Sequence, residues 1–532
     1  MKNRLGIILL LFLSFVNRSF SQNSDHPNDP QGEVIYHLFQ RSFYDSNGDL
    51  QGDLNGVREK LDYLQDLGVT SILLLPLYES VFYHNYFSGD FEKIDEEFGS
   101  MTDFIDLVKA VHAHGMKIYL DMETQYVTED HQWWKDSYGN LNSAYSDYIL
   151  YDDSAHTKPA SIVFDLTSVT GYDNTTRKAG TVNLKSKNVL EYNYKLFKYF
   201  VDPNGDGKFD DGADGFRLDH MMDNLDGKPQ LTNLFADFWS PLFLRLRQVN
   251  PNLKFIAEQA NWMSYGFDYF NEGNVDRVFA FGLQYAISSF NKKKIEAIAD
   301  TTFNGTPAGK EQVVFIENHD MKRFASAMNR DLNKEKVGAA LSLLLGGVPS
   351  VYYGQELGMF GIGGFNRFNN TDANDIPQRE AFEWNKSDAG KGMAIWYKNS
   401  GPWWDSTNLK ANDGVSLEEE KNDPMSLYNF YKKMIALHKT NQAIAFGSYK
   451  TVDNDNASVL TFMRSFENRK VLVAVNLSSS NQVASVIPGG TGTGNFSNSS
   501  LHLLYRSSEP NNKTHALSFD LRPYAIEVWG TE

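Results

Sequence analysis

The sequence contains no cysteine in its 532 residues. A disulfide framework and a lipid-anchored N-terminal cysteine are both excluded, so stability has to come from the hydrophobic core and from bound ions. Long apolar runs are also absent beyond residue 16, and the run at 5–16 is shorter than the roughly 20 residues that a membrane-spanning helix needs. We therefore expect a soluble mature chain without a membrane anchor.

Basic residues are outnumbered by acidic ones, 50 against 67, which gives a net charge of −17 and an isoelectric point near 5.2. This balance argues against nucleic acid or an anionic membrane as the main partner, because both attract positive charge. It says nothing against a neutral ligand. The chain is longer than one core usually supports, so we expect two or three domains.

The first residues have the pattern of a secretory signal peptide. Lys2 and Arg4 supply a basic start, residues 5–16 an apolar stretch, and residues 19–21 a small-x-small cleavage site. We predict a signal peptide over residues 1–21 and a linker over 22–31, which makes the mature protein secreted or periplasmic. A buried first helix is the alternative for the apolar stretch.

Beyond the linker, short apolar runs alternate with segments of helical periodicity. Leu54, Val57, Leu61, Leu64 and Leu67 are spaced as on one face of a helix, between two apolar runs. This alternation predicts a parallel sheet with helical crossovers. Eight runs are candidate strands, the number that closes a (β/α)8 TIM barrel. They are 34–39, 72–75, 116–120, 215–218, 255–257, 277–279, 313–316 and 350–353.

The alternation is interrupted once and later gives way to a different pattern. Residues 123–186 are rich in Tyr, Trp, Asp, Ser and Thr, which predicts a domain inserted after the third strand. Beyond residue 438, short alternating runs separated by turn residues are typical of an antiparallel β-sandwich. We thus predict an α/β fold, with a barrel over 32–122 and 187–438, an inserted domain over 123–186 and a C-terminal β-sandwich over 439–532.

Three acidic residues, Asp219, Glu258 and Asp320, each stand at or just beyond the end of an apolar run. A parallel barrel brings the C-terminal ends of its strands into one mouth, so these carboxylates can meet there. Each alone is more often a solvated strand end or a helix cap. However, Arg217 precedes Asp219 by two residues, and His319 immediately precedes Asp320. The set indicates glycoside chemistry, which needs carboxyl groups in different protonation states.

With these motifs the chain resembles the α-amylase family of glycoside hydrolases. The resemblance extends over nearly the whole mature chain. It includes the Gly-Phe-Arg-Leu-Asp motif ending at Asp219, the Glu after the fifth strand, the Glu-Asn-His-Asp motif ending at Asp320, and the Tyr-Tyr-Gly-Gln-Glu-Leu-Gly segment at 352–358. It implies the same barrel and an enzyme that cleaves α-glucosidic bonds by double displacement.

The resemblance also implies roles for individual residues. Asp219 matches the family's nucleophile, Glu258 its acid/base, and Asp320 the third carboxylate, which stabilises the transition state. Four further residues match family positions that contact substrate or orient the nucleophile: Tyr86 as an aromatic platform, Arg217 beside Asp219, His319 and Arg323. Tyr126 stands where the family has His and is a further candidate, by bonding to or stacking on a sugar. A purely structural contact is the alternative for each of them.

The sequence departs from the family pattern in several places. Gln125 and Tyr126 replace the usual Asn and His, which help to bind a calcium ion and the substrate respectively. The family's calcium site between the barrel and the inserted domain is therefore in doubt. After Asp219 the sequence has His220, Met221, Met222 and Asp223, where many α-amylases place Lys-His for the leaving-side sugars, so the family's linkage preference does not transfer.

Two other loops carry oxygen ligands at alternate positions, a spacing that suits calcium. The first loop has Asp45, Asn47 and Asp49, with Asp53 following. For this loop, a turn held by bonds from side chains to the backbone is the alternative. The second resembles an EF-hand loop, although Ala213 stands where the EF-hand places Glu. Its candidate ligands are Asp202, Asn204, Asp206, Lys208 and Asp210.

We expect a retaining hydrolase that cleaves α-1,4 bonds of starch, glycogen or maltodextrin and acts as a monomer, with calcium at one or two sites. An α-glucosidase or oligo-1,6-glucosidase acting on short oligosaccharides, or a transglycosylase, is compatible with the same motifs. A non-catalytic glucan-binding or transporter-partner protein is the remaining alternative, and the presence of all three carboxylates argues against it.

Overall fold

The computed structural model describes residues 32–364, 366–492, 501–510 and 517–531. The predicted signal peptide and linker lie outside these residues. No helix within the described part of the chain is long and apolar enough to cross a membrane.

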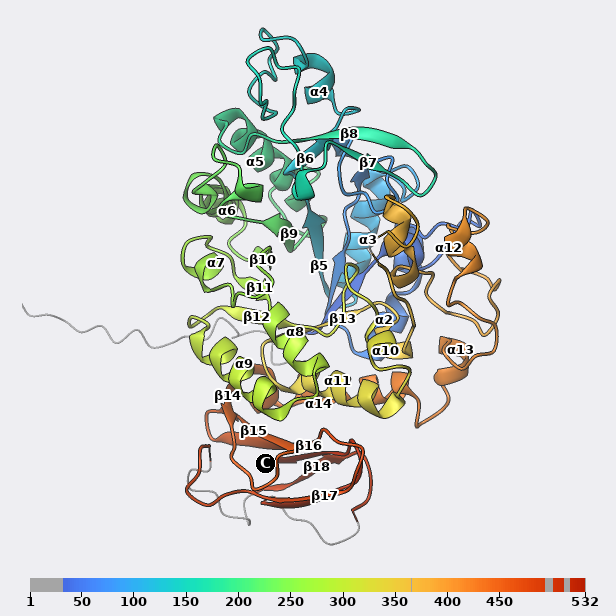
Figure 1. Cartoon of the computed structure of the whole chain (residues 1–532), viewed down its shortest axis with the longest axis vertical. Helices are drawn as coiled ribbons and strands as arrows, with labels where there is room; N and C mark the ends of the chain where they lie inside the picture. The colour runs from blue at the N-terminus through green and yellow to red at the C-terminus, as the bar shows by residue number, and fades with distance from the viewer. Residues whose placement is uncertain (1–31, 365, 493–500, 511–516, 532) are drawn as a thin grey trace, which may run out of the picture. The chain divides into compact units, whose positions relative to one another are not determined.

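Eight parallel strands close into a barrel in the order β1-β13-β12-β11-β10-β9-β5-β2 (Figure 1). The barrel closes because β1 pairs with both β2 and β13. All eight predicted strands are present, so the TIM-barrel prediction is confirmed. The strands are β1 (Ile35–Leu38), β2 (Ser71–Leu74), β5 (Lys117–Met122), β9 (Gly215–Met221), β10 (Lys254–Gln259), β11 (Arg277–Phe279), β12 (Glu311–Val314) and β13 (Val348–Tyr352).

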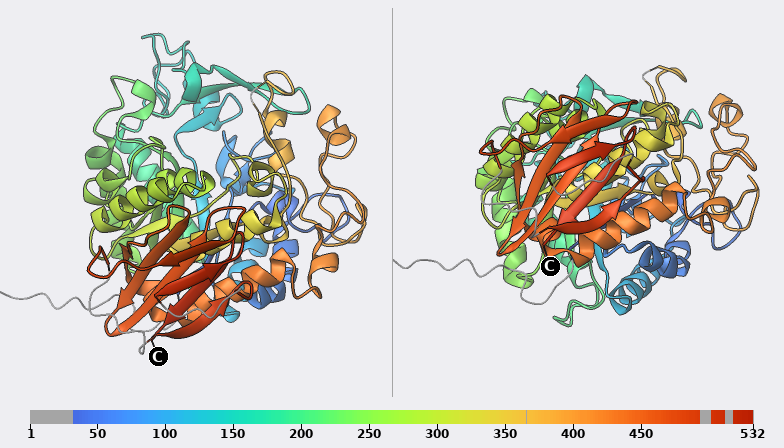
Figure 2. Two further views of the ribbon diagram at one scale, coloured as in Figure 1. Left: turned by 60° about the horizontal axis from the view of Figure 1, so that its bottom comes forward. Right: turned by 90° about the horizontal axis from the view of Figure 1, so that it is seen from below.

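Helices surround the barrel, as the views of Figures 1 and 2 show. In α3 the buried residues Phe104, Leu107, Val108 and Val111 form the apolar stripe that faces the core. The single helix predicted through residues 54–67 is in fact two, because the backbone leaves the helical conformation at Lys60. The main helices are α1 (Leu54–Glu59), α2 (Leu61–Leu67), α3 (Met101–Ala113), α5 (Lys187–Val201), α6 (Ser240–Val249), α8 (Phe281–Ser288), α9 (Lys292–Gly305), α11 (Leu332–Leu344) and α14 (Leu427–Thr440).

Strand alternation divides the side chains of the barrel between two environments. In β9, Phe216 and Leu218 pack into the core shared with the helices, and Arg217 and Asp219 take the alternate positions. A separate apolar cluster, which includes Ile256 of β10, fills the barrel interior. The polar residues at the C-terminal strand ends lie in the mouth above this cluster.

Residues 123–186, predicted as an inserted domain, contain a small sheet of order β6-β8-β7. Its strands are β6 (Tyr126–Thr128), β7 (Ser168–Thr170) and β8 (Thr176–Thr181), and the short helix α4 (Gln132–Ser137) lies between β6 and β7 in the chain. A separate two-stranded sheet precedes them in the chain, and its strands are β3 (Tyr78–Glu79) and β4 (Asp90–Ile94). Figure 1 shows this segment beside the strand ends of β5 and β9.

The C-terminal region forms antiparallel sheets, seen face-on in Figure 2. Val473 and Val475 of β16 belong to the main core, whereas Leu472 and Ala474 pack against a second core that includes Phe519. The two faces of the sheet are thus both covered, as in a sandwich. One sheet contains β14 (Ser448–Thr451), β15 (Val459–Phe466), β16 (Arg469–Asn476), β20 (Ile526–Gly530) and β18 (His502–Arg506), and the other β17 (Gln482–Ser485) and β19 (Ser518–Leu521).

A long connection between β13 and α14 carries a short helical segment, η6 (Asp372–Gln378), and returns part of the chain to the mouth of the barrel. The predicted start of the C-terminal domain, residue 439, falls within the last turn of α14. The remaining short helices are α7 (Phe267–Asn271), α10 (Phe324–Ala327), α12 (Pro402–Asp405), α13 (Leu417–Glu420) and α15 (Gln442–Phe446).

Candidate active site

The buried guanidinium of Arg217 is the centre of the site. Its Nη1 atom lies 2.6 Å from Asp121 Oδ2 and 2.5 Å from Asp219 Oδ1, and its Nη2 atom lies 2.8 Å from Glu258 Oε2. Only 1% of Arg217 is exposed. Three carboxyl groups from three neighbouring strands therefore share one cation.

Strand register explains why these groups meet. Asp121 of β5 pairs directly with Arg217 of β9, and Ile256 of β10 pairs with Arg217 from the other side. Asp219 and Glu258 lie two residues further along their strands, on the same face. The prediction placed Asp219, Glu258 and Arg217 together, and the structure brings them together. The prediction did not include Asp121 among the candidate site residues, although this acid at the end of the third strand was visible in the sequence.

The protonation of this cluster follows from its charges. Burial raises the pKa of Asp219 above its usual range, Arg217 opposes the rise, and Glu258 and Asp121 add to it. Burial likewise raises the pKa of Asp121 to about 6, against the lowering effect of Arg217. Three acids facing a single positive charge cannot all ionise easily, so the cluster can retain a proton near neutral pH.

A second group of side chains faces this cluster. The hydroxyl of Tyr86 donates a hydrogen bond to Asp121 Oδ2 at 2.7 Å and lies 2.9 Å from His319 Nε2. The ring of Tyr86 is stacked on that of His319, with 5.7 Å between centroids. Burial lowers the pKa of His319 well below its usual range, and Arg379 and Arg217 add to this effect. The contact from His319 Nε2 to Asp320 Oδ2, at 3.1 Å, therefore involves a neutral imidazole.

Asp320 has a partner that the sequence did not indicate. Arg379, which follows η6, places Nη2 3.1 Å from Asp320 Oδ1 and 3.5 Å from Asp375 Oδ2. Its Nε atom also donates to the backbone carbonyl of His319 at 2.8 Å. No local motif marks this arginine, because its position depends on the path of the long connection after β13.

Arg323 does not lie where the prediction put it. The side chain is fully buried, with Nη1 3.0 Å from Glu317 Oε1 and 2.5 Å from the carbonyl of Tyr353. It also lies over the ring of Tyr352. It does not line the pocket formed by the described residues, so the structure assigns it a packing contact and corrects the expected substrate contact.

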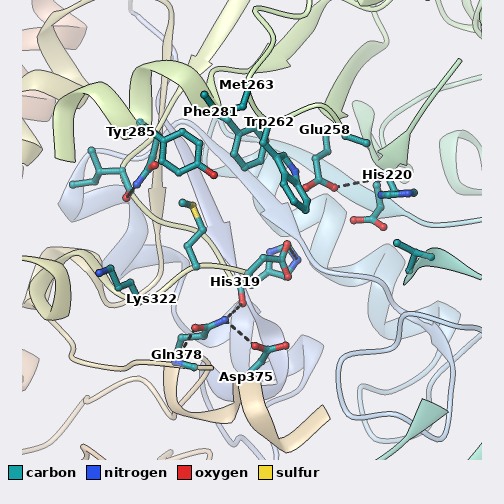
Figure 3. A pocket seen from close by; sticks show the side chains of 18 of the residues that line it. His220, Glu258, Trp262, Met263, Phe281, Tyr285, His319, Lys322, Asp375 and Gln378 are labelled. Atoms are coloured by element: carbon teal, nitrogen blue, oxygen red, sulfur yellow. Dashed lines mark hydrogen bonds and ion pairs between the residues drawn. The ribbon is translucent and has the colours of Figure 1, made fainter. Parts of the chain in front are cut away.

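The acidic cluster opens into a cavity of about 1410 Å³. Its walls include Tyr86, Asp219, Glu258, His319 and Asp320. Figure 3 shows apolar side chains, among them Trp262, Met263, Phe281 and Tyr285, on the opposite side of this pocket from Asp375 and Gln378. The volume exceeds the roughly 300–1,000 Å³ that is usual for small-molecule sites, so the pocket has room for an oligomeric ligand.

Tyr126 also lines this pocket but is almost completely buried. Its hydroxyl donates to Asp226 Oδ2 at 2.7 Å, so the polar end of the side chain already has a partner. Gln125, the neighbouring departure from the family pattern, donates from Nε2 to the carbonyl of Asp219 at 2.5 Å. Both residues thus support the segment that follows Asp219.

The first predicted calcium loop is held by bonds within the turn. Asp45 accepts from the backbone N–H groups of Gly48 and Leu50, and Asp49 accepts from Gln51. Asn47 accepts from the N–H of Asp49, and the carboxylate of Asp53 caps α1. These contacts match the turn alternative. Among the described residues, no group of three or more acidic or histidine side chains is arranged around a common metal position.

The second loop shows similar bonds and one further feature. Asp202 accepts from the N–H groups of Asp206 and Gly207, and Asn204 accepts from Asp206. Asp206 is paired with Lys208 through Nζ at 3.2 Å. Asp210 offers its carbonyl to His112. Next to it, Asp211 is buried, and neither of its carboxylate oxygens has a hydrogen-bond partner among the described residues.

The oxygen-rich donor set of this second loop, together with the unpaired buried carboxylate of Asp211, is compatible with a hard cation such as calcium. Burial raises the pKa of Asp211, and the nearby carboxylates of Asp210 and Asp202 raise it further. A bound cation would relieve this repulsion. The first loop has no comparable unpaired group among the residues described.

Comparison with known proteins agrees with this geometry. A family model described as "Alpha amylase, catalytic domain" matches residues 37–234 and 251–447. The chain is 28% identical over 483 residues to alpha-amylase 3 of Dictyoglomus thermophilum, with 88% of each chain covered. It is 25% identical to the probable oligo-1,6-glucosidase 3 of Bacillus subtilis, over 93% of this chain and 98% of that protein.

A solved structure shares the whole architecture. The crystal structure of an alpha-amylase from H. orenii superimposes with a TM-score of 0.77 at 25% sequence identity. The match covers 94% of this chain and 100% of that one. The fold is therefore the same from the first barrel strand to the C-terminal sheets.

Proposed function

Because the chain belongs to the α-amylase family of glycoside hydrolases and is an enzyme, we propose that it is a retaining α-glucan hydrolase that cleaves α-1,4 bonds of starch, glycogen or maltodextrin. The observation that carries this proposal is the set of Asp219, Glu258 and Asp121 on Arg217, placed at the base of a pocket of about 1410 Å³. Glycoside hydrolysis needs two such carboxyl groups in different protonation states.

In the proposed mechanism, a carboxylate oxygen of Asp219 attacks the anomeric carbon while Glu258 gives its proton to the departing glycosidic oxygen. Glu258 Oε2 forms an ion pair with Arg217 Nη2 and accepts a hydrogen bond from the backbone N–H of His220, which leaves Oε1 for the proton transfer. Glu258 then removes a proton from water, whose oxygen attacks the same carbon and releases Asp219. The sugar leaves with its original configuration.

Other groups of the pocket support this chemistry. Burial, the largest effect, leaves the pKa of Asp219 raised overall, and the positive charge of Arg217 opposes this rise and stabilises the carboxylate form that attacks. Tyr86 presents a ring at the pocket wall, and Asp320, held by Arg379, faces the same space. We assign Tyr86 and His319 to sugar binding and Asp320 to stabilisation of the positive charge that develops on the sugar ring.

The size of the pocket favours a polymeric or oligomeric substrate over a single short one. Exposed side chains at its wall, Trp262 and Phe164, extend the apolar surface beyond the acidic cluster. Action on short oligosaccharides is the second candidate, because the similar Bacillus subtilis protein is named a probable oligo-1,6-glucosidase.

Product analysis distinguishes these activities. The purified protein is incubated with amylose, pullulan, maltotriose and isomaltose, and the products are resolved over time. A ladder of oligosaccharides from amylose supports the proposal, glucose from the short substrates alone supports a glucosidase, and new longer oligosaccharides indicate transglycosylation. Asp219→Asn is the control for a non-catalytic protein, because it removes hydrolysis and leaves glucan binding. The absence of any product with the unmodified protein refutes a hydrolase.

We also propose that calcium binds the loop at 202–211, close before β9, with Asp202, Asn204 and Asp206 among its ligands. The unpaired carboxylate of Asp211 supports this assignment. Metal analysis after dialysis against calcium, compared with Asp202→Ala, tests it. The proposal is supported if the wild type binds calcium and melts at a higher temperature with the ion, and if the variant does not bind it. Equal metal content in the two proteins contradicts it.

We further propose that residues 1–21 direct export and are removed. N-terminal sequencing of protein recovered outside the cytoplasm of a producing cell is the test. A mature terminus at residue 22 agrees with this proposal, and an intact Met1 contradicts it.

A further inference from the structure

Two residues beside Glu258 have an uncommon backbone conformation. His220 has φ of 43° and Asp226 has φ of 50°, both in the left-handed region. Non-glycine residues rarely adopt this region, and they remain there where their surroundings hold them. Both residues line the pocket next to Glu258. His220 lies where the register between β9 and β10 shifts, at a β-bulge, and its side-chain contacts show what holds it there.

Asp226 is the point where these contacts meet. Its Oδ1 atom lies 2.9 Å from His220 Nε2, and its Oδ2 atom accepts from the hydroxyl of Tyr126 at 2.7 Å. The ammonium group of Lys228 lies 3.3 Å from Oδ2. The side chain of Asp226 is 10% exposed, so these partners replace most of its water.

The charges of this group are consistent with a fixed network. Burial acts to raise the pKa of Asp226, but the hydrogen bonds from His220 and Tyr126, together with the charges of His220 and Lys228, outweigh it, and the pKa is lowered. Burial and the neighbouring Asp226 raise the pKa of Tyr126 well above its usual range, so the phenol keeps its proton and donates it. Because Asp226 is ionised and accepts, His220 Nε2 carries the hydrogen of their bond.

The network reaches the proposed acid through the backbone. The N–H of His220 donates to Glu258 Oε2 at 3.1 Å, the bond drawn from His220 in Figure 3. Gln125 donates to the carbonyl of Asp219, which belongs to the same peptide group as the N–H of His220. The side chain of His220 is therefore anchored by Asp226 while its backbone orients Glu258. Gln125 and Tyr126 are also among the positions at which the sequence departs from its family.

We propose that Asp226 is a positioning residue for Glu258. By holding His220 in its left-handed conformation, Asp226 keeps the N–H of His220 on Glu258 Oε2 and leaves Oε1 directed to the glycosidic oxygen. The departures at Gln125 and Tyr126 are then parts of one arrangement, in which Tyr126 and His220 bind the two oxygens of the same carboxylate. This inference rests on the proposed role of Glu258 as the acid.

The test compares two substrates that differ in their need for an acid. Leaving groups such as 2,4-dinitrophenolate depart without protonation, whereas the sugar leaving group of maltotriose needs a proton. General acid catalysis contributes about 10²–10⁴-fold to rate, so a misplaced acid loses a part of that factor. For Asp226→Asn we expect kcat/KM to fall about 10–100-fold on maltotriose and less than about threefold on 2,4-dinitrophenyl α-maltoside.

Two further variants keep the test informative if Asp226→Asn folds poorly. Tyr126→Phe removes one bond to Asp226, and we expect a smaller loss with the same dependence on the leaving group. His220→Ala removes the anchored ring but keeps the backbone N–H, and we expect the pattern of Asp226→Asn. Asp237→Asn is the matched control, because Asp237 pairs with Lys185 at the surface and should leave both rates unchanged.

The outcomes separate this inference from the proposed function. An equal loss on both substrates, with the melting temperature unchanged, overturns the positioning role and indicates a general role in sugar binding. Glu258→Gln should lose maltotriose hydrolysis while retaining cleavage of the dinitrophenyl substrate. If Glu258→Gln shows no such difference, the role of Glu258 as the acid fails, and the positioning role of Asp226 fails with it. If only Asp226→Asn lacks the difference, the inference alone fails.

Discussion

Replacement of Arg217 by lysine is the most direct test of the acidic cluster. The guanidinium bonds Asp121 and Asp219 through Nη1 and Glu258 through Nη2. A lysine has one nitrogen and a different reach, so we expect it to keep one of these three contacts. Each hydrogen bond to a charged group contributes about 1.5–3 kcal/mol. The loss of two therefore amounts to about 3–6 kcal/mol, or a fall in kcat/KM of about two to four orders of magnitude.

The assay is the initial rate of reducing-end release from amylose, with the melting temperature measured in parallel. Arg245→Lys is the control, because Arg245 pairs with Glu191 in a half-exposed position and such pairs contribute little. We expect Arg217→Lys to lose activity and Arg245→Lys to retain it. An Arg217→Lys enzyme that keeps more than a tenth of the wild-type kcat/KM would show that the shared guanidinium does not organise the site.

Three further predictions concern single side chains. Tyr86→Phe keeps the ring but loses the hydroxyl bond to Asp121, and kcat/KM on amylose should fall about tenfold, since such a bond contributes about 1.5 kcal/mol; an unchanged rate would contradict this. Burial raises the pKa of Glu356 from near 4.5 to about 7. The protonated carboxyl therefore contributes to the free energy of unfolding in full below about pH 4.5, and this contribution, about 3 kcal/mol, is lost as the pH rises through about 7. Glu356→Gln should remove this loss, which urea unfolding at pH 5 and pH 8 measures, and an identical pH dependence in both proteins would refute it. Asp53→Ala removes the N-cap of α1, and in the absence of calcium it should lower the free energy of unfolding by about 1 kcal/mol. A larger loss when the same comparison is made in the presence of calcium would indicate an ion in the first loop.

Much of the fold could be predicted because its signals are local. The apolar runs identified all eight barrel strands, since a buried strand reads as a short apolar segment. The break at Lys60 was missed, because the spacing of Leu54, Val57 and Leu61 continues across it. The motifs around Asp219 and Glu258 were equally readable, because strand alternation fixes which side chains share a face.

Other contacts could not be predicted from any local pattern. Arg323 was expected at the substrate by its spacing from Asp320, yet its guanidinium turns to Glu317 in the core. Arg379 faces Asp320 only because a long connection returns to the mouth of the barrel. The direction of a side chain depends on the packing of segments distant in sequence, which spacing does not record.

The sequence by itself determined the class of fold and which principal carboxylates share a face of the barrel, because hydrophobic periodicity and strand alternation act over a few residues. Only the tertiary structure decided which distant groups complete the site. Closure of the barrel places Asp121 on Arg217 across the pair β5 and β9. The turn at Asp226 joins Tyr126 to His220 and hence to Glu258. Such contacts join residues about a hundred positions apart in the chain. The conformational entropy lost in closing so long a loop is compensated only when the whole barrel forms.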